Sequence, residues 1–384
     1  MHIAGIIAEY NPFHNGHKWF VERARESGAT HIVAVMSGNF VQRGEPALFH
    51  HAVRTKAALD GGVDLVLQLP VPYAVSGAQS FARAGVEILD SFGCDSLVFG
   101  SECGNGKVIS DVARIVYSDK LKPLLADELK KGISFASARE NALRAINEEY
   151  ADIIRHPNNI LGVEYAAAIQ RKKSGMEIRT FMRTGADHDS SVSDGCVASA
   201  SLIRERIISG GEWEGFVPDK NIYGGEFADV SAVEKAILYR MRTMSAQEIA
   251  AAPDISEGIE NRIYSAARQA TSVQELYDIA KTKRYSHARI RRIVLCCFLG
   301  ITVEDAQTPV PYIRVTGFNS RGTELLKNCR SSLPVITKAA DVAALSDGAH
   351  RIFAAECRAG DIYSLCFSNP KMCGEEKSLR PVIL

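Results

Sequence analysis

Near the start of this 384-residue chain stands the sequence Ile3-Ala4-Gly5-Ile6-Ile7-Ala8-Glu9-Tyr10-Asn11-Pro12-Phe13-His14-Asn15-Gly16-His17. Its first half is a short apolar run, which is typical of a strand buried on both faces. Pro12 and Gly16 break this run, and apolar residues then recur at helical spacing. The sequence therefore predicts a first strand over residues 2–9 that leads directly into a helix over residues 16–27.

The same alternation of strand and helix continues through about 211 residues. Four further strands are expected, over residues 31–36, 63–70, 96–100 and 176–182. This order predicts an α/β fold with a doubly wound parallel sheet of five strands and right-handed crossovers. No Gly-x-Gly-x-x-Gly follows the first strand, which argues against the dinucleotide-binding version of such a fold.

The rest of the chain has a mainly helical pattern. Helices are expected over residues 230–252, 257–270, 273–281 and 288–299. Alternating segments at 310–318 and 361–367 then predict the strands of a small α/β unit. The length suits two domains, which we place at residues 1–211 and 212–384.

Composition restricts the class of protein and its partners. The 45 Lys and Arg residues balance 45 Asp and Glu residues, so any binding of nucleic acid must come from a local basic patch. The nine cysteines form no Cys-x-x-Cys pair and no zinc-ligand spacing, which predicts reduced thiols in a cytoplasmic protein. We expect neither a membrane span, which needs ~18–20 apolar residues, nor a secretion signal.

Two histidines, His14 and His17, stand where the first strand leads into the first helix. A helix N-terminus offers free backbone N–H groups and a partial positive charge, which favour a phosphate. Histidine N–H groups there can stabilise negative charge as it grows on a phosphoryl group, and Gly16 lets the backbone approach closely. The alternative is chance, because His-x-Gly-His is a short motif.

A second polar motif, Ser199-Ala200-Ser201-Leu202-Ile203-Arg204, opens a helix after the fifth strand. Serine is a favoured N-cap, and Arg204 lies on roughly the same helix face as Ser201. Most of one domain separates this motif from the two histidines, as would be the case for two halves of one nucleotide cleft. An ordinary helix cap is the alternative.

The loop at residues 37–46 follows the second strand, at the edge of the sheet where α/β proteins bind ligands. A solvated surface loop is the alternative. The expected substrate contacts are its small and polar residues, Ser37, Gly38, Asn39, Gln42 and Arg43.

A dense basic segment covers residues 281–292, and no acid occurs from residue 279 to residue 303. Such a patch suits a phosphate backbone, with Tyr285 or an arginine available to stack on a base. The alternative is a solvated helix end whose cations favour the helix dipole. The expected RNA contacts are Lys281, Lys283, Arg284, Arg289, Arg291 and Arg292.

Signatures of other catalytic classes do not occur: the chain has no Gly-x-Ser-x-Gly, no P-loop and no His-Glu-x-x-His. Asp187-His188-Asp189 is rich in metal-ligating side chains, but adjacent residues point in different directions. We therefore expect no protein metal site. Cys196, near the second motif, is interpreted as a structural thiol rather than a nucleophile.

Four motifs in order carry a resemblance: His-x-Gly-His, the loop Ser37–Ala47, the segment Asn158-Asn159-Ile160-Leu161-Gly162, and Ser-x-Ser-x-x-Arg. With them the chain resembles the bacterial tRNA(Met) cytidine acetate ligase family, within the nucleotidyltransferase superfamily that shares a HUP-like sheet. The resemblance covers essentially the whole chain, although the sequence at 187–189 is shorter and more acidic than is usual in the family. The resemblance implies an ATP site made of Ile7, Ala8, Glu9, Tyr10, Asn11, Pro12, Phe13, His14, Asn15, Gly16, His17, Lys18, Trp19, Phe20, Gly100, Asn159 and Arg183.

The same resemblance implies an activity. The family activates acetate with ATP to acetyl-adenylate and pyrophosphate, and then acetylates N4 of the wobble cytidine C34 of elongator tRNA(Met). Residues 1–211 would be the catalytic domain and residues 212–384 the tRNA-binding region. Mg²⁺ is expected with the triphosphate. His14, His17 and Lys18 would be catalytic, while Ser199, Ser201 and Arg204 would hold the β- and γ-phosphates.

Two other functions stay open at this point. One is a small-molecule adenylyltransferase of cofactor synthesis, against which the long helical extension and the basic segment argue. The other is a non-catalytic RNA-binding protein on a nucleotidyltransferase scaffold, against which the intact histidines and Arg204 argue. The sequence leaves the oligomeric state and the proton acceptor for the cytidine amine open.

Overall fold

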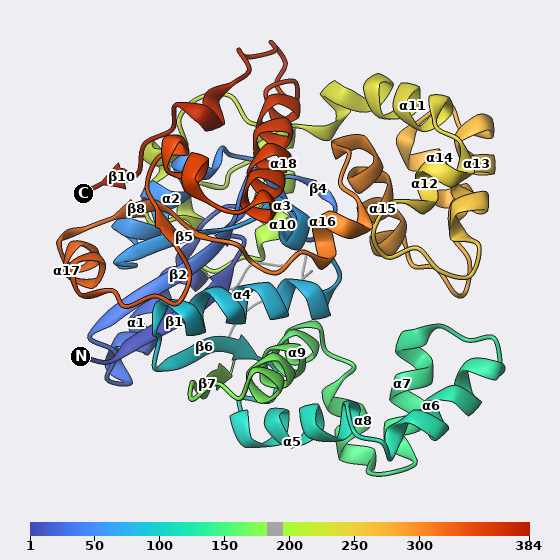
Figure 1. Cartoon of the computed structure of the whole chain (residues 1–384), viewed down its shortest axis with the longest axis horizontal. Helices are drawn as coiled ribbons and strands as arrows, with labels where there is room; N and C mark the ends of the chain where they lie inside the picture. Colours follow the sequence, from blue (N-terminus) through green and yellow to red (C-terminus); the bar gives the residue numbers. More distant parts are fainter. Residues whose placement is uncertain (183–194) are drawn as a thin grey trace.

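A computed structural model describes residues 1–182 and 195–384. A twisted central sheet lies between two layers of helices (Figure 1). The strand order is β10-β8-β5-β2-β1-β6-β7, and β9 pairs with β8. Five neighbouring strands are mutually parallel: β5 (Leu65–Leu69), β2 (His31–Ser37), β1 (Ile3–Ala8), β6 (Ser96–Ser101) and β7 (Glu177–Met182). The α/β class and the predicted parallel sheet are thereby confirmed.

Strand β2 shows why these segments form a central sheet. All seven of its residues are buried, because helices cover both of its faces. Val33 and Val35 pack into the core beneath α4 (Ala78–Phe92) and α9 (Pro157–Lys172). The alternate residues, Ile32 and Ala34, pack into the core beneath α1, α2 and α10. The bounds of those three helices are Asn15–Glu26, His51–Asp60 and Ala200–Ser209.

Strand β1 and helix α4 approach one another closely. A Cβ at Gly85 would lie 2.6 Å from Cδ1 of Ile7, and a Cβ at Gly5 would lie 2.7 Å from the δ-carbons of Leu89. Both positions favour glycine, since a methyl group there would displace the side chain that packs against it. The close packing of β1 against α4 fixes the position of β1 in the sheet. It thereby also fixes where the His-x-Gly-His segment begins.

The position of β1 also fixes where a ligand is expected. The chain builds β2 and β5 on one side of β1 and then returns to place β6 and β7 on the other side. A crevice at the carboxyl ends of the strands forms where the strand order reverses in this way. In this protein that point lies between β1 and β6.

The C-terminal part differs from the prediction. Strand β8 (Ile313–Phe318) runs antiparallel to β5 and extends the central sheet, so the expected separate α/β unit is wrong. Strands β9 (Val335–Ile336) and β10 (Val382–Ile383) pair with β8. The strand predicted over 361–367 is also wrong, because that segment contains the end of helix α18 (Asp347–Tyr363) and the turns after it.

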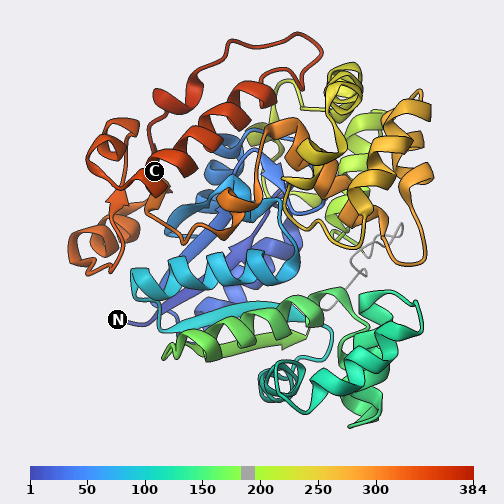
Figure 2. The same cartoon turned by 45° about the vertical axis from the view of Figure 1, so that its right-hand side comes forward.

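Two groups of helices project from the sheet on the same side of the molecule (Figures 1 and 2). The first group follows β6 and contains α5 (Gly106–Val116), α6 (Leu121–Lys130), α7 (Phe135–Arg144) and α8 (Glu148–Ile153). The second group has its own core with α18 and contains α11 (Glu234–Thr243), α12 (Ala246–Ala250), α13 (Ile259–Gln269), α14 (Val273–Ala280) and α15 (His287–Leu299). Short helices α3 (Val71–Ala74), α16 (Val303–Gln307) and α17 (Ser320–Asn328) connect the remaining segments. Within the described ranges no helix is long and apolar enough to span a membrane.

Candidate nucleotide site

The two histidines form the cap of helix α1. The backbone N–H of Gly16 donates to Nδ1 of His14 (3.1 Å), and the backbone N–H of His14 donates to Nδ1 of His17 (3.3 Å). The ring centroids of the two histidines are 3.7 Å apart. Because Nδ1 accepts in both rings, each neutral ring carries its proton on Nε2. The cap therefore presents two N–H donors at a helix N-terminus, as phosphate binding requires.

Aromatic packing holds these rings in place. The rings of Tyr10 and Phe13 lie 4.9 and 5.6 Å from that of His17, and the hydroxyl of Tyr223 donates to the carbonyl of Phe13 (2.8 Å). A Cβ at Gly16 would lie 3.0 Å from Cε1 of His14, so the motif needs glycine there. The predicted donors are thus preorganised before any ligand binds.

Other residues of the 7–20 segment have different positions. Ile7 packs beneath α4, and Lys18 is exposed, 4.0 Å from Glu22 on the same helix. Trp19 is 36% exposed on the outer side of α1, with Arg23 5.9 Å from its ring. Phe20 packs edge-on against Phe181 of β7. Within this segment, Asn11 and Asn15 contact the second motif or the residues just before it.

Arg54 is a site-forming residue that sequence reasoning did not identify. It is completely buried on α2 and donates to the carbonyls of Phe49 (2.9 Å), Glu9 (2.6 Å) and Ser37 (3.1 Å), and also to that of Gly38. These carbonyls belong to the ends of β1 and β2 and to the start of α2. Burial lowers the pKa of this guanidinium to about 10, so it stays charged at neutral pH. The same helix face also buries His51 and Thr55, so the sequence of α2 gives no clear signal for this role.

The second motif meets the first across the end of β1. Ser199 is the N-cap of α10 and accepts from the backbone N–H of Leu202 (3.1 Å). Arg204 donates to the carbonyl of Asn11 (2.9 Å) and lies 3.4 Å from the hydroxyl of Ser201. Asn15 of α1 donates to the carbonyl of Cys196 just before α10 (2.9 Å). The predicted convergence of the two motifs is therefore present in the fold.

The loop at 37–46 is built into the protein, so the alternative of a solvated loop is wrong. It contains a small antiparallel pair, β3 (Phe40–Val41) and β4 (Glu45–Pro46), and much of it is buried. The backbone N–H of Gln42 donates to Oε1 of Glu9 (2.8 Å), and Oδ1 of Asn39 accepts from the backbone of His51 (2.9 Å). Glu45 lies 3.5 Å from Arg204, so the loop also contacts the second motif.

The end of β6 is tied to helix α9. Oδ1 of Asn159 accepts from the backbone N–H groups of Glu102 (3.0 Å) and Cys103 (3.2 Å), and the Glu102 carboxylate accepts from the backbone of Asn159 (2.8 Å). Gly100 is the residue of β6 just before this clamp. Asn159 therefore shapes the far wall of the β1/β6 crevice. Arg183 and Asp187-His188-Asp189 lie outside the described residues.

The basic segment divides into two parts. Lys281, Lys283 and Arg284, which we call the exposed basic segment, are at the surface before α15. Arg289, Arg291 and Arg292 are partly buried on α15, and Arg289 and Arg292 pair with Asp254 at 3.4 and 3.6 Å. The predicted base-stacking role of Tyr285 is wrong, because its ring is buried and its hydroxyl donates to the carbonyl of Glu257.

Helix α15 also contacts the substrate loop directly. Gly44 has φ +81°, and a Cβ there would lie 2.9 Å from the backbone nitrogen of Arg292. A side chain at this position would therefore collide with the helix as well as strain the backbone. The exposed basic segment and the loop are thus connected through one helix.

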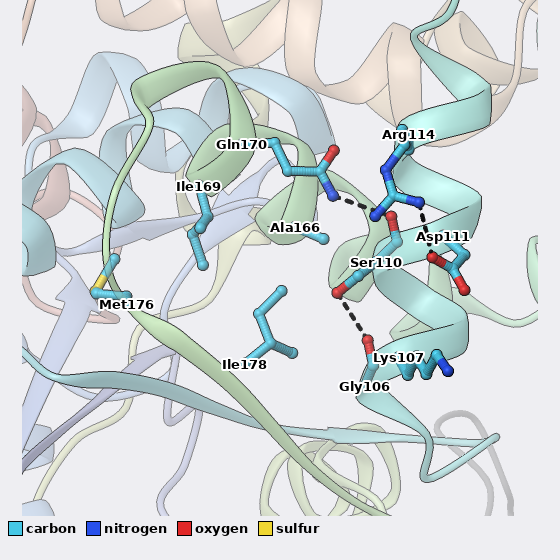
Figure 3. A pocket seen from close by; sticks show the side chains of 10 residues that line it. All are labelled: Gly106, Lys107, Ser110, Asp111, Arg114, Ala166, Ile169, Gln170, Met176 and Ile178. Atoms are coloured by element: carbon cyan, nitrogen blue, oxygen red, sulfur yellow. Dashed lines mark hydrogen bonds and ion pairs between the residues drawn. The ribbon is translucent and has the colours of Figure 1, made fainter.

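A separate pocket of about 400 Å³ lies between α5, α9 and β7 (Figure 3). Its apolar floor includes Ile169 and Ile178, and its polar groups bond one another: Gln170 donates to the carbonyl of Ser110 (3.0 Å), and Arg114 pairs with Asp111 (3.0 Å). None of its lining residues belongs to the two motifs. The candidate site is therefore the end of β1, not this pocket.

Comparison with known proteins agrees with this geometry. The sequence model of the HIGH nucleotidyl transferase family matches residues 1–378. A tRNA(Met) cytidine acetate ligase of Acetivibrio thermocellus is 36% identical, and the alignment covers 100% of both chains. The chain belongs to the tRNA(Met) cytidine acetate ligase family. A ligase of this family from Thermoanaerobacter sp. is 38% identical over 97% of this chain and 98% of its own length.

The fold of this ligase family is also known from solved structures. The crystal structure of apo TmcAL from Thermotoga maritima has a TM-score of 0.93 and 31% identity, with complete coverage of both chains. The structure of the same protein bound with alpha-thio ATP has a TM-score of 0.92. The HUP-like nucleotidyltransferase fold is thereby confirmed across the whole chain.

Proposed function

We propose that this protein is an ATP-dependent ligase that activates acetate and acetylates tRNA. Acetate attacks the α-phosphate of ATP, which forms acetyl-adenylate and releases pyrophosphate. The acetyl group then passes to N4 of the wobble cytidine C34 of elongator tRNA(Met), giving N4-acetylcytidine. The names of the full-length relatives support this reaction. The observation that carries it is the histidine cap of α1, which Arg204 of the second motif approaches by donating to the carbonyl of Asn11.

Each part of the site has a role in this proposal. His14 and His17 stabilise charge on the α-phosphate, and Lys18 neutralises the triphosphate. Ser199, Ser201 and Arg204 hold the β- and γ-phosphates at the start of α10. Gly100, Asn159 and Arg183 complete the nucleotide site with the 7–20 segment. The loop residues Ser37, Gly38, Asn39, Gln42 and Arg43 enclose acetate and the cytosine.

Mg²⁺ is proposed to arrive with ATP rather than as a resident metal. Among the residues the structure describes, no cluster of three His, Cys, Asp or Glu side chains is arranged to hold a metal. Mg²⁺ is commonly bound through substrate phosphates with only one or two carboxylates, so it needs no such cluster. Its part is to neutralise the polyphosphate.

RNA recognition is assigned to the helical part of residues 212–384, while residues 1–211 carry the ATP chemistry. The exposed basic segment suits a phosphate backbone. Arg289, Arg291 and Arg292 lie between it and the substrate loop, where they would act on nucleotides entering the site. We place the reaction in the cytoplasm, because all nine cysteines are free thiols.

The test is ATP–pyrophosphate exchange with the purified chain, with acetate, propionate, pantetheine phosphate or nicotinamide mononucleotide supplied one at a time. Exchange that depends on acetate supports the proposal. Exchange with a phosphorylated metabolite would instead identify an adenylyltransferase of cofactor synthesis. No exchange, with or without tRNA, would favour an RNA-binding protein and refute the ligase assignment.

A further inference from the structure

Transfer of an acetyl group to an amine releases one proton, and the histidines are poorly placed to take it. Both accept a backbone N–H at Nδ1, so the neutral rings offer only Nε2–H donors to a ligand. A proton acceptor must therefore come from another element. The described residues place three carboxylates on or against the substrate loop: Glu9, Glu45 and Glu356.

Two of these carboxylates are already committed to protein contacts. Glu356 of α18 is 3% exposed, and its oxygens accept from Nε2 of Gln68 (2.7 Å) and from the backbone of Val71. Glu45 is paired with Arg204 at 3.5 Å, so its carboxylate already faces the guanidinium of the second motif. Neither is suited to accept a proton from a bound amine.

Glu9 differs from both. It follows β1 and contacts the substrate loop, and only part of its side chain is buried. Oε1 accepts from the backbone N–H of Gln42 (2.8 Å). No other described residue donates to Oε2. Among the described residues, one carboxylate oxygen is thus anchored to the loop and the other is left to accept a proton.

We propose that Glu9 is the general base of the acetyl-transfer step, an inference that rests on the proposed ligase function. The N4 nitrogen of cytidine attacks the acetyl carbonyl carbon, and the C–O bond to the adenylate phosphate breaks. AMP leaves with that electron pair, and the proton lost from N4 passes to Oε2 of Glu9. Glu9 is thereby a catalytic residue for the second half-reaction, whereas His14 and His17 serve the first.

The surroundings of Glu9 set its pH dependence. Arg204 and Arg43 lower its pKa and Glu45 raises it, while Tyr165 of α9 and the Arg54 guanidinium also lie within its electrostatic reach. Burial has the largest effect, and the pKa of Glu9 is raised above its usual range. A general base works in its ionised form. The transfer rate should therefore rise with pH through this raised pKa and then level off.

The experiment separates the two half-reactions in three variants. Glu9→Gln keeps an oxygen that can accept from Gln42 but cannot take a proton, whereas Glu9→Ala loses both functions. Glu26→Gln, an exposed glutamate at the far end of α1, is the matched control. Acetate-dependent pyrophosphate exchange reports acetyl-adenylate formation. Single-turnover transfer from preformed acetyl-adenylate to tRNA(Met), measured from about pH 5 to 9, reports the second step.

For Glu9→Gln we expect transfer to fall by about 10²–10⁴-fold, at least ten times more than pyrophosphate exchange falls, and the rise with pH to vanish. Glu26→Gln should match the unmodified protein in both assays. The inference is overturned if Glu9→Gln transfers at a normal rate with a normal pH profile, or if it loses exchange as severely as transfer. Failure of the unmodified protein to exchange with acetate would instead remove the ligase function itself.

Discussion

Replacing Arg54 with methionine should both destabilise the protein and impair adenylation. The side chain is fully buried and donates to the carbonyls of Glu9, Ser37, Gly38 and Phe49. Methionine fills much of the same volume but donates nothing, so these buried carbonyls lose their partner. The β1–β2 ladder ends at the pair Ala8 and Met36, just before Glu9 and Ser37.

The size of the effect follows from two opposing contributions. A hydrogen bond from a charged donor contributes about 1.5–3 kcal/mol, so four of them would suggest a very large loss. Burying the guanidinium costs several kcal/mol in the folded protein, and methionine does not incur that cost. Each buried carbonyl left without a donor costs about 1–3 kcal/mol, so a net loss of about 3–5 kcal/mol remains after that saving. We expect a loss of that order in the free energy of unfolding for Arg54→Met.

The effect on catalysis should be separate from the effect on stability. The contacted carbonyls position Glu9 and the loop, and a displacement of about 1 Å at a site can cost 10²-fold in rate. Urea unfolding would measure the stability change, and acetate-dependent pyrophosphate exchange at a temperature where the variant is folded would measure the rate. Arg23→Met on the exposed face of α1 is the control and should change stability by less than about 0.5 kcal/mol. A loss below about 1 kcal/mol with normal exchange would refute this account of Arg54.

Three further predictions concern the other parts of the site. His14→Ala or His17→Ala should lower pyrophosphate exchange by about 10²–10³-fold while tRNA binding persists in a filter assay; normal exchange would exclude their role at the phosphate. Reversing all three charges of the exposed basic segment should weaken tRNA binding and flatten its salt dependence, and unchanged affinity in a salt titration would contradict the RNA assignment. Gly44→Ala should destabilise the loop against α15 by about 1–2 kcal/mol in a thermal melt, with a loss of transfer; an unchanged melt would argue against the left-handed backbone at this position.

The sheet could be predicted largely because local signals and global fold agree in it. Four of the five parallel strands, β1, β2, β5 and β6, are short and mainly apolar runs, and β2 is buried along its whole length, whereas β7 mixes polar and apolar residues. The structure of residues 310–384 could not be predicted from local signals of this kind. β8 pairs with β5 across about 250 residues of chain, and pairing at that separation leaves no local pattern. The segment at 361–367 was misassigned because its apolar residues serve the helix end and turns that pack into the second core.

The candidate site shows the same division between local and distant information. The N–H donors of His14 and His17 are set by local contacts, since the hydrogen bonds that fix both tautomers lie within residues 14–17. The contacts that hold the surrounding strand ends are not local: Arg204 donates to the carbonyl of Asn11, 193 residues away, and Arg54 donates to carbonyls at the ends of β1 and β2 from a helix whose sequence looks ordinary. A motif therefore indicates which groups can act, but only the packing shows which of them are already occupied. This is why the proton acceptor could not be named from the sequence, whereas the pairing of Glu45 with Arg204 and of Glu356 with Gln68 leaves Glu9 as the acceptor we propose.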